Sequence, residues 1–387
     1  MDFIYPPEAE ALRRELRAWL DEHCTERFRG LRGTSIGADP ERLALMRAWN
    51  RLVADAGYAT ISWPVAFGGR AASVMEQVVW AEEMDRAGAP ALLNPIGLAN
   101  IAPAIMEWGD DDQKERLLPP MRRGDHIWCQ GFSEPDAGSD LASLRTSARR
   151  DGDHYVVNGQ KIWNTLGDVA DWCELLVRTD PDAPKHAGIS CLLVDMTLPG
   201  IETRPITTIT GDAEFNEIFF DDVRVPASAL LGPEHQGWRV AMTTLNNERG
   251  GVATLHLMVR RRIAELLATA RTVTVAEGVT ATEDPRWRAR LMRCYVEGEF
   301  LKFLSDRALS AAAHGRTGAE GALVKLVWSE TSQHVSTLAA ELLGPDGLGG
   351  PWGTDRMHAR SLGIAGGTTQ VNKNIVARSV LGLPKGV

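Results

Sequence analysis

The 387-residue chain contains little cysteine and no excess of positive charge. Its five cysteines are an odd number, they are widely spaced, and no two of them form a C-x-x-C pair. This spacing favours free thiols in a reducing compartment over a disulfide framework or a zinc site. The net charge of −9 argues against nucleic acid or an anionic membrane as a partner, because both repel an acidic surface. A negatively charged substrate would therefore need local positive charge.

The sequence also lacks a long apolar run and a recognisable export signal. No apolar stretch approaches the length that crosses a bilayer. The first eight residues are acidic and have no basic region of the kind that opens a secretory signal. These absences predict a cytoplasmic protein. The histidines share no spacing of the kind that binds a metal, so we expect no metal site.

Hydrophobic periodicity divides the chain into three parts. Helical spacing dominates residues 1–124, short β-forming runs separated by turns fill residues 125–233, and helical spacing returns over residues 234–387. The order predicts an α+β protein with an N-terminal α-helical domain, a middle β-barrel or sandwich domain and a C-terminal four-helix bundle. The strands are expected at 155–157, 172–179, 189–194, 215–220 and 223–226, and the helices of the last part at 238–272, 285–313, 318–343 and 372–381.

Two neighbouring stretches in the middle of the chain have the composition of a ligand-binding loop. Residues 131–140 read GFSEPDAGSD, and their Gly, Pro and Ser residues predict a turn that exposes backbone N–H groups and hydroxyls. Gly138 is expected to supply positive-φ freedom and close approach. Residues 157–165 read VNGQKIWNT. Taken alone, the first stretch is more typical of a surface turn than of a binding loop, and the tryptophan is more typical of a core residue.

Taken together, S-E-P-x-A-G-S-D and N-G-x-K-x-W-x-x resemble the flavin-binding signature of the acyl-CoA dehydrogenase family, and the likeness continues along nearly the whole chain. The resemblance implies an FAD-dependent flavoprotein of fatty acid or lipid β-oxidation. Such an oxidoreductase desaturates an acyl-CoA thioester and passes electrons to an electron-transfer flavoprotein. A planar flavin with polar edges suits an aromatic face and fixed donors. The implied flavin contacts are Phe132, Ser133, Gly138, Ser139, Trp163 and Thr165, and Ser139 is also expected to admit the polar arm of the thioester.

The implied reaction needs a carboxylate that removes the α-proton in a dry site while the β-hydrogen leaves as hydride to flavin N5. In many family members this Glu stands immediately before a Gly-Thr near the C-terminus, where this chain has Gly366. A minority branch carries it on the first helix of the bundle, and Glu248 matches that position. The alternative is that Glu248 is an exposed carboxylate on the surface of a helix, where most glutamates lie. Gly250 and Gly251 each cost an expected helix about 1 kcal/mol, which favours close approach by a ligand or tight helix packing.

The resemblance also assigns roles to the flanking residues. The backbone N–H of Gly366 would bind the thioester carbonyl and stabilise the enolate-like charge of α-deprotonation. Glycines that lead into a helix N-terminus expose N–H groups to a pyrophosphate or carbonyl. Substrate binding is implied for Asn246 and for Arg249, which would supply the positive charge that CoA needs. Contacts with the flavin nucleotide, usually that of a neighbouring subunit, are implied for Gly367, Thr368 and Gln370.

One family element is missing. The Arg-x-x-Phe element, which helps hold FAD across a subunit interface, is not recognisable after Glu248, although Arg286, Arg288 and Arg290 lie in that region. We therefore expect a homo-oligomer, a dimer or tetramer, or one chain of a hetero-oligomer like the relatives that act on steroid side chains. Two further alternatives stay open. One is an oxygen-using flavoenzyme on the same fold, and the other is a non-catalytic subunit that supplies only structure or FAD contacts.

Overall fold

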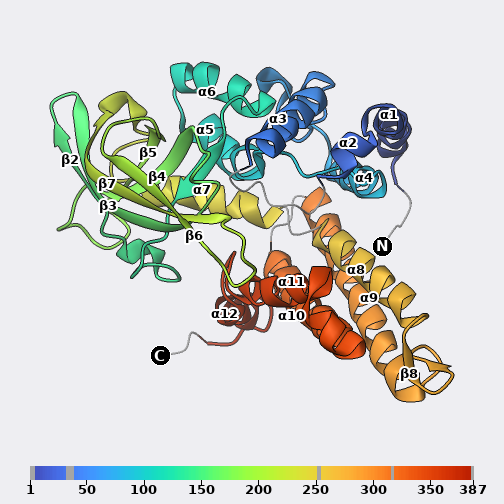
Figure 1. Ribbon diagram of the computed structural model, residues 1–387. Helices are drawn as coiled ribbons and strands as arrows, with labels where there is room; N and C mark the ends of the chain where they lie inside the picture. Colours follow the sequence, from blue (N-terminus) through green and yellow to red (C-terminus); the bar gives the residue numbers. More distant parts are fainter. Residues whose placement is uncertain (1–4, 32–38, 251–253, 315–317, 385–387) are drawn as a thin grey trace. The chain divides into compact units, whose positions relative to one another are not determined.

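A computed structural model describes residues 5–31, 39–250, 254–314 and 318–384 (Figure 1). Contacts divide the chain into two compact units. Unit 1 comprises Met1–Arg14, Ser73–Asp85 and Arg249–Val387, and unit 2 comprises Glu15–Ala72 and Arg86–Glu248. Along the chain, helices come first, then a sheet, then helices again, so the predicted α+β class is confirmed. The predicted domain boundaries stay a prediction, because the two units follow packing and not chain order.

The helices of unit 2 begin at residues that satisfy free backbone N–H groups. Asp39 accepts from the N–H groups of Glu41 and Arg42 at the start of α3, and Asp110 forms a reciprocal capping box with Gln113 at the start of α6. A π-helical turn, Gly97–Ile101, precedes α5. The α-helices that lie in unit 2, wholly or in part, are α1 (Pro7–His23), α2 (Glu26–Arg29), α3 (Pro40–Asp55), α5 (Ala102–Trp108), α6 (Asp111–Arg123) and α7 (Gly237–Gly250).

The sheet of unit 2 has seven strands in the order β1-β4-β2-β3-β7-β6, with β5 paired to β4. They are β1 (Trp128–Gly131), β2 (Ser147–Asp151), β3 (His154–Thr165), β4 (Trp172–Arg178), β5 (Ile189–Asp195), β6 (Ile201–Ile206) and β7 (Phe215–Pro226). The predicted strands at 172–179 and 189–194 are confirmed as β4 and β5. Sequence reasoning missed β1 and β6, and it divided β7 in two. β3 is longer than expected and bulges against β7 between Lys161 and Asn164.

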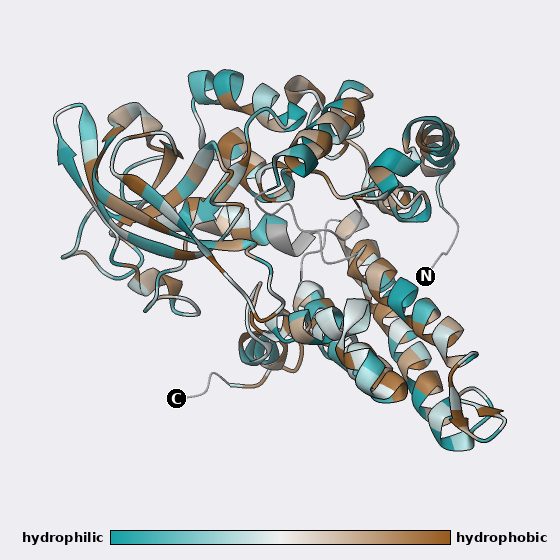
Figure 2. Cartoon of the chain, in the orientation of Figure 1, coloured by the Kyte–Doolittle hydropathy of each residue, from teal (hydrophilic) through white to brown (hydrophobic). Residues whose placement is uncertain are grey.

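Both faces of this sheet are covered. One face packs through Trp128, Leu176 and Cys191 against Ile105 of α5 and Val240 of α7. The opposite face closes on a second core that includes Cys129, Tyr155, Val157, Cys173 and Ile218. Figure 2 shows the resulting hydrophobic colour along the central strands. The sheet therefore gives unit 2 two separate interiors, each able to bury a polar side chain.

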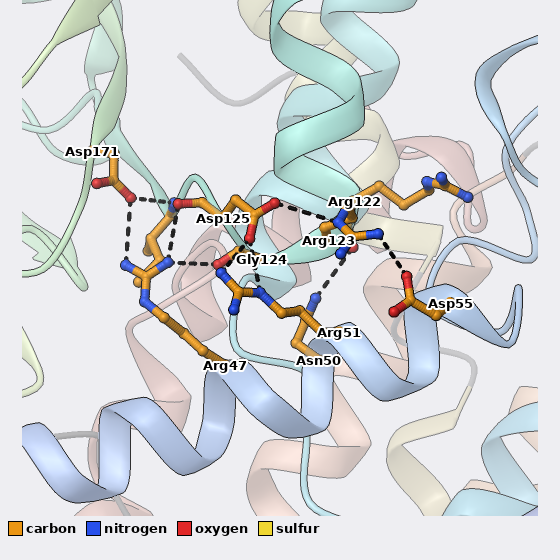
Figure 3. Close-up of polar contacts among 10 residues, drawn as sticks. Arg47, Asn50, Arg51, Asp55, Arg122, Arg123, Gly124, Asp125 and Asp171 are labelled. Carbon is orange, nitrogen blue, oxygen red and sulfur yellow. Dashed lines mark hydrogen bonds and ion pairs between the residues drawn. The ribbon is translucent and has the colours of Figure 1, made fainter.

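A group of charged residues fixes the connection from α6 to β1 (Figure 3). Arg47 of α3 donates to the carbonyls of Gly124 (2.6 Å) and Asp125 (3.0 Å), and its guanidinium lies 3.6 Å from the Asp171 carboxylate. Arg51 donates to the Asp125 carboxylate at 2.6 Å. Gly124 ends α6 with φ +74°, and a Cβ there would lie 2.7 Å from Asn50, so the close approach requires glycine.

Unit 1 contains a helical bundle. Its core includes Val259 and Ile263 of α8, Leu291 and Cys294 of α9, and Leu338 of α10. The helices are α4 (Val74–Arg86, nearly all in unit 1), α8 (Leu255–Ala270), α9 (Pro285–Ala313), α10 (Glu320–Leu343), α11 (Gly350–His358) and α12 (Thr369–Ser379). None of the helices within the described ranges is both long enough and apolar enough to cross a membrane.

Two expectations for the last part of the chain are wrong. The single helix expected over 238–272 is two helices in the described residues, because α7 ends at Gly250 and α8 begins at Leu255. Gly250 is thus a terminal residue of α7 and not an interior one, while Gly251 lies outside the described residues. The loop expected at 276–284 contributes to a short hairpin of β8 (Thr274–Ala276) and β9 (Val279–Thr280).

Candidate functional site

A buried ion pair joins the two signature stretches. The Nζ of Lys161 on β3 is completely buried and lies 2.9 Å from Oε1 of Glu134 and 3.0 Å from the carbonyl oxygen of Phe132. The Glu134 carboxylate also accepts from the backbone N–H groups of Arg145 (2.7 Å) and Thr146 (2.8 Å). The Glu of S-E-P and the Lys of N-G-x-K are therefore partners in the fold. Sequence reasoning assigned neither of them a role.

Charge compensation decides the ionisation of Glu134. Burial raises the pKa of this carboxyl, but the nearby Lys161 ammonium and the hydrogen bonds to the carboxylate outweigh burial and hold its pKa below the ordinary value. Burial lowers the pKa of Lys161, and Glu134 opposes that shift. Glu134 is thus a carboxylate with a partner for each of its oxygens. The pair fixes the backbone from Phe132 onward.

Trp163 stands out in the same region because its backbone and its exposure are both unusual. It follows the start of the bulge in β3, has φ +65°, and its side chain is 56% exposed. Its ring meets the Phe215 ring edge-on, with centroids 6.0 Å apart. A positive φ in a bulky residue costs energy, and an exposed indole leaves an aromatic face uncovered. Thr165 ends the strand two residues later, and the carbonyl oxygen of Ser133 accepts from the N–H of Ile162 at 3.0 Å.

Polar atoms without hydrogen-bond partners lie in the strands around Trp163. Within the described residues these include Oδ1 of Asn164, Oδ1 of Asn216 and Nε2 of Gln130, all buried. The amide of Asn164 donates to the carbonyl of Gln130, and the amide of Asn216 donates to the carbonyl of Asn164 at 3.2 Å. An exposed aromatic face beside fixed polar groups fits a planar aromatic ligand with polar edges, such as a flavin ring. Sequence reasoning missed Gln130, Asn164 and Asn216, although Asn164 stands between two predicted site residues.

The rest of the signature turn is open to solvent. Gly138 and Ser139 are both exposed, and a Cβ at Gly138 would meet no atom within 4 Å. Gly138 is not among the positive-φ residues, so the expectation that it needs left-handed freedom is wrong. Its surroundings permit close approach by a ligand but do not require glycine. The role of Ser139 in binding the thioester stays a prediction.

The predicted C-terminal loop lies in unit 1 and leads into a helix as expected. Gly366 and Gly367 have φ values of +61° and +88°, and both are exposed. Thr368 is the N-cap of α12, and its hydroxyl accepts from the N–H of Val371 at 3.1 Å. Gln370 follows in the first turn of α12 and is exposed. The glycine conformations suit N–H groups that face a ligand, as predicted, and the ligand contacts of these residues stay predictions.

The candidate base and its neighbours lie at the end of α7. Glu248 is the last residue of unit 2 and Arg249 the first of the following segment of unit 1, and the side chains of both lie outside the described residues. Asn246 is exposed. Unit 2 therefore contains Glu248 together with the flavin candidates of the sheet. The loop at Gly366 belongs to the other unit.

One cluster of possible metal ligands lies in unit 1. Ligand atoms of Cys294, Glu297 and His334 lie within 4.8 Å of one another, and this is the single such group in the part of the chain that the structure describes. Nδ1 of His334 already lies 2.7 Å from the Glu297 carboxylate, which Arg293 also contacts at 2.9 Å. Spacing along the chain could not reveal the group, because its histidine comes from α10 and the other two residues from α9. Arg293 already supplies a cation to this carboxylate.

The order of a helical part, a seven-stranded sheet with a signature loop, and a helical bundle defines a three-part α+β protein. Three family models match the chain in the same order. They are the acyl-CoA dehydrogenase N-terminal domain over residues 6–125, the middle domain over 129–223 and the C-terminal domain over 235–381. The chain belongs to the acyl-CoA dehydrogenase family, whose members are oxidoreductases.

Individual family members are similar to this chain over nearly its full length. The chain is 38% identical to the acyl-CoA dehydrogenase IpdE1 of Mycobacterium tuberculosis, with 98% of each chain covered. It is 33% identical to FadE26 of the same organism, covering 100% of this chain and 99% of that protein. Among solved structures it is similar to the ChsE4-ChsE5 complex of M. tuberculosis (TM-score 0.87, 32% identity) and to the Tcur3481-Tcur3483 steroid ACAD (TM-score 0.86, 32% identity). Both matches cover 100% of each chain.

Proposed function

We propose that the chain uses FAD to desaturate an acyl-CoA thioester between its α- and β-carbons, with Glu248 as the base. The observation that carries this proposal is the exposed Trp163 beside the ion-paired signature loop, a surface that fits a flavin ring. The bound flavin would accept the β-hydrogen as hydride and pass the electrons to an electron-transfer flavoprotein. Glu248 removes the α-proton, and its position on α7 compensates for the glycine at position 366.

The remaining candidates hold the ligand or stabilise charge. The N–H of Gly366 binds the thioester carbonyl, where negative charge develops as the α-proton leaves. Arg249 and Asn246 bind the CoA portion, and Ser139 borders its path. Phe132, Ser133 and Thr165 contact the polar edge of the flavin ring. These roles rest on the family motif, supported by the glycine conformations at 366–367 and by the fixed backbone at Phe132.

A second chain of the same family completes the FAD site in this proposal. Two of the similar solved structures are the paired proteins ChsE4-ChsE5 and Tcur3481-Tcur3483, and the second is a steroid ACAD. Arg290, one of the candidate replacements for the missing element, already pairs with Glu341. α9 also carries an exposed apolar stripe at helical spacing, which suits a protein contact. Its residues are Met292, Tyr295, Val296, Phe300 and Phe303.

The first experiment is a visible spectrum of the purified chain, alone and co-expressed with a family homologue. A panel of acyl-CoA thioesters that includes a steroid side-chain thioester is then added without oxygen. Bleaching of a flavin spectrum by one thioester supports the dehydrogenase and indicates the acyl class. Flavin that appears only with the homologue supports the paired assembly. A chain that holds no flavin in either preparation contradicts the proposal, and rapid reoxidation by oxygen favours an oxidase.

The base assignment predicts a selective loss. Glu248→Gln should abolish thioester-dependent bleaching and turnover while leaving the bound flavin spectrum intact, because the amide cannot accept the α-proton. The measurement is the bleaching rate under anaerobic stopped flow. Glu115→Gln, at an exposed carboxylate on α6, is the matched control and should behave as wild type. A Glu248→Gln protein that bleaches at the wild-type rate removes Glu248 as the base.

A further inference from the structure

Two adjacent threonines attach α7 to two different elements of unit 2. Nε1 of Trp108 on α5 donates to Thr243 Oγ1 at 3.0 Å, and Thr243 lies 3.1 Å from the carboxylate of Glu107. Thr244 turns toward the sheet and donates to Oε1 of Glu174 on β4 at 2.7 Å. Among the described side chains of α7, Thr244 is the last to hydrogen-bond to another element. The described end of the helix is thus held by this hydrogen bond and by Leu245, which packs against the core of unit 2.

Glu174 is an unusual residue for that position. It is completely buried in the interior that the sheet shares with α5 and α7. The groups that face it are Gln130 from β1, Cys191 from β5, whose Sγ lies 4.0 Å away, and Thr244 from α7, and no charged residue is among the described groups that contact it. Burial raises the pKa of Glu174 to about 8, while burial also raises that of the Cys191 thiol, so both are neutral near pH 7.

The second carboxyl oxygen of Glu174 has no partner. Oε2 of Glu174 and Nε2 of Gln130 are both buried without a hydrogen bond in the described residues. Gln130 lies in register with Glu174 on the neighbouring strand and its side chain lowers the pKa of Glu174, but Nε2 of Gln130 forms no hydrogen bond with Oε2 of Glu174. An apolar side chain would fill this site without the cost of burying a carboxyl. What the carboxyl adds is a short hydrogen bond from Thr244 at 2.7 Å, beside a weak contact from the Cys191 thiol at 4.0 Å.

The hydrogen bond between Thr244 and Glu174 lies close enough along α7 to affect the position of the proposed base. Thr244 and Glu248 are four residues apart on α7, so they lie one turn apart on the same helix face. Misplacing a catalytic group by 1 Å can reduce the rate by about 10²-fold. A contact that fixes the helix one turn before Glu248 therefore affects the position of Glu248 and, through it, the rate.

We propose that Glu174 is a positioning residue, which fixes the last turn of α7 through Thr244 and so sets the place from which Glu248 acts. The inference rests on the proposed function of Glu248. It goes beyond that role because it assigns a task to a residue of the sheet that touches neither flavin nor thioester. It also implies that ionisation of Glu174 loosens the helix end, since a buried charge without a cation draws in water.

Three variants test the proposal in the flavin-loaded protein, with the partner chain present if loading needs it. Glu174→Leu and Thr244→Val each remove the bond and should lower kcat about tenfold with little change in KM. The double variant should lose no more than either single one, because both remove the same bond. Glu174→Gln keeps an acceptor oxygen and should retain wild-type kcat at pH 7. Its pH profile should lack the decline near pH 8 that the wild type shows.

The matched control is Glu107→Gln, which makes the same change at an exposed carboxylate beside the neighbouring Thr243 and should leave the pH profile unaltered. Amide hydrogen exchange over residues 240–247 measures the helix end without turnover. Lower amide protection in Glu174→Leu than in the wild type, together with wild-type protection in Glu174→Gln, supports the positioning role of Glu174. Wild-type kcat in Glu174→Leu, additive losses in the double variant, or an unchanged decline near pH 8 in Glu174→Gln would overturn it. If Glu248→Gln remains active, the base assignment fails, and the exchange data still report on the anchor.

Discussion

Unit 2 buries two glutamates, Glu134 in the signature loop and Glu174 on β4, and their surroundings give them opposite ionisation. Glu134 meets the ammonium of Lys161 and two backbone N–H groups, and its pKa is lowered. Glu174 meets one threonine hydroxyl and no cation among the described residues, and burial raises its pKa to about 8. Lys161 lies beside Cys173, in the core on one side of the sheet, whereas Glu174 lies beside Cys191, in the core on the other.

The difference separates two uses of a buried carboxyl. A paired carboxylate holds a loop rigidly, because breaking the pair leaves an uncompensated charge in the interior. An unpaired neutral carboxyl offers one directional bond, and it is sensitive to pH. The first use suits the signature loop, whose backbone must stay fixed at Phe132. The second suits a helix whose end carries a group that must be aimed.

The largest expected effect comes from removing the cation of the first pair. Lys161→Met should lower the free energy of unfolding by about 3–5 kcal/mol, because Glu134 would remain buried without its partner. Urea unfolding of the wild type and the variant at pH 7 measures the difference. The flavin content of the purified variant should also fall, since the signature loop loses its anchor.

A surface pair provides the control for this prediction. Lys185→Met removes the partner of Asp140, and both side chains are well exposed. The loss there should be much smaller than for Lys161→Met, because solvent screens both charges. If Lys161→Met costs no more than Lys185→Met, the buried pair does not stabilise the loop, and the contrast between the two glutamates disappears.

The next effect is a difference in pH dependence. Glu174 has an ordinary pKa of 4.5 and a pKa of about 8 in the folded protein. Between these values the folded state holds a proton that the unfolded state has released. Wild-type stability should therefore fall as pH rises through this window, by about 1.4 kcal/mol per pH unit from this group, and level off above it. Glu174→Gln cannot titrate, so its stability relative to wild type should increase from pH 5 to pH 8.

The contribution of Glu134 to stability should change with pH in the opposite direction. Its folded pKa is lowered, so its contribution to stability is present at neutral pH and is lost as pH falls through the folded pKa. Glu134→Gln should be destabilised at pH 7, and the deficit should shrink in acid. Thermal unfolding across a pH series measures both variants. Parallel curves for Glu134→Gln and Glu174→Gln would contradict the assignment of the two ionisation states.

The sequence predicts much of this fold because its periodicity is strong. The helical spacing over residues 1–124 and the apolar strands at 172–179 and 189–194 are confirmed, since repeating apolar residues mark buried faces regardless of distant partners. β1 was missed because its four residues, Trp128–Gly131, are too few to show a period, and pairing with β4 makes them a strand. Contacts between distant segments decide such elements.

The candidate site likewise combines features that local sequence predicts with features that depend on contacts between distant residues. Motif spacing singled out Trp163, whose flavin contact stays a prediction, and it predicted that the glycines at 366–367 lead into a helix, although the expected start at 372 falls after the observed start at Thr369. It could not predict that Lys161 pairs with Glu134, 27 residues away, or that Glu174 meets Thr244, 70 residues away. A buried glutamate looks like any other glutamate in sequence. The flanking run Trp172–Arg178, apolar on both sides of Glu174, was the available signal.

The smallest expected effects distinguish a side-chain anchor from a backbone anchor. Thr244 holds Glu174 through its hydroxyl, whereas Arg145 holds Glu134 through its backbone N–H and extends an exposed side chain. Thr244→Val should therefore cost about 1–2 kcal/mol, because Oε1 of Glu174 loses its hydroxyl donor in a buried site and keeps only the weak contact from the Cys191 thiol at 4.0 Å. Arg145→Ala should change stability by less than about 0.5 kcal/mol, because any residue other than proline supplies the same N–H. Urea midpoints at pH 7 measure both. Equal losses in the two variants would mean that the Arg145 side chain contributes and that the signature loop is not held by its backbone alone.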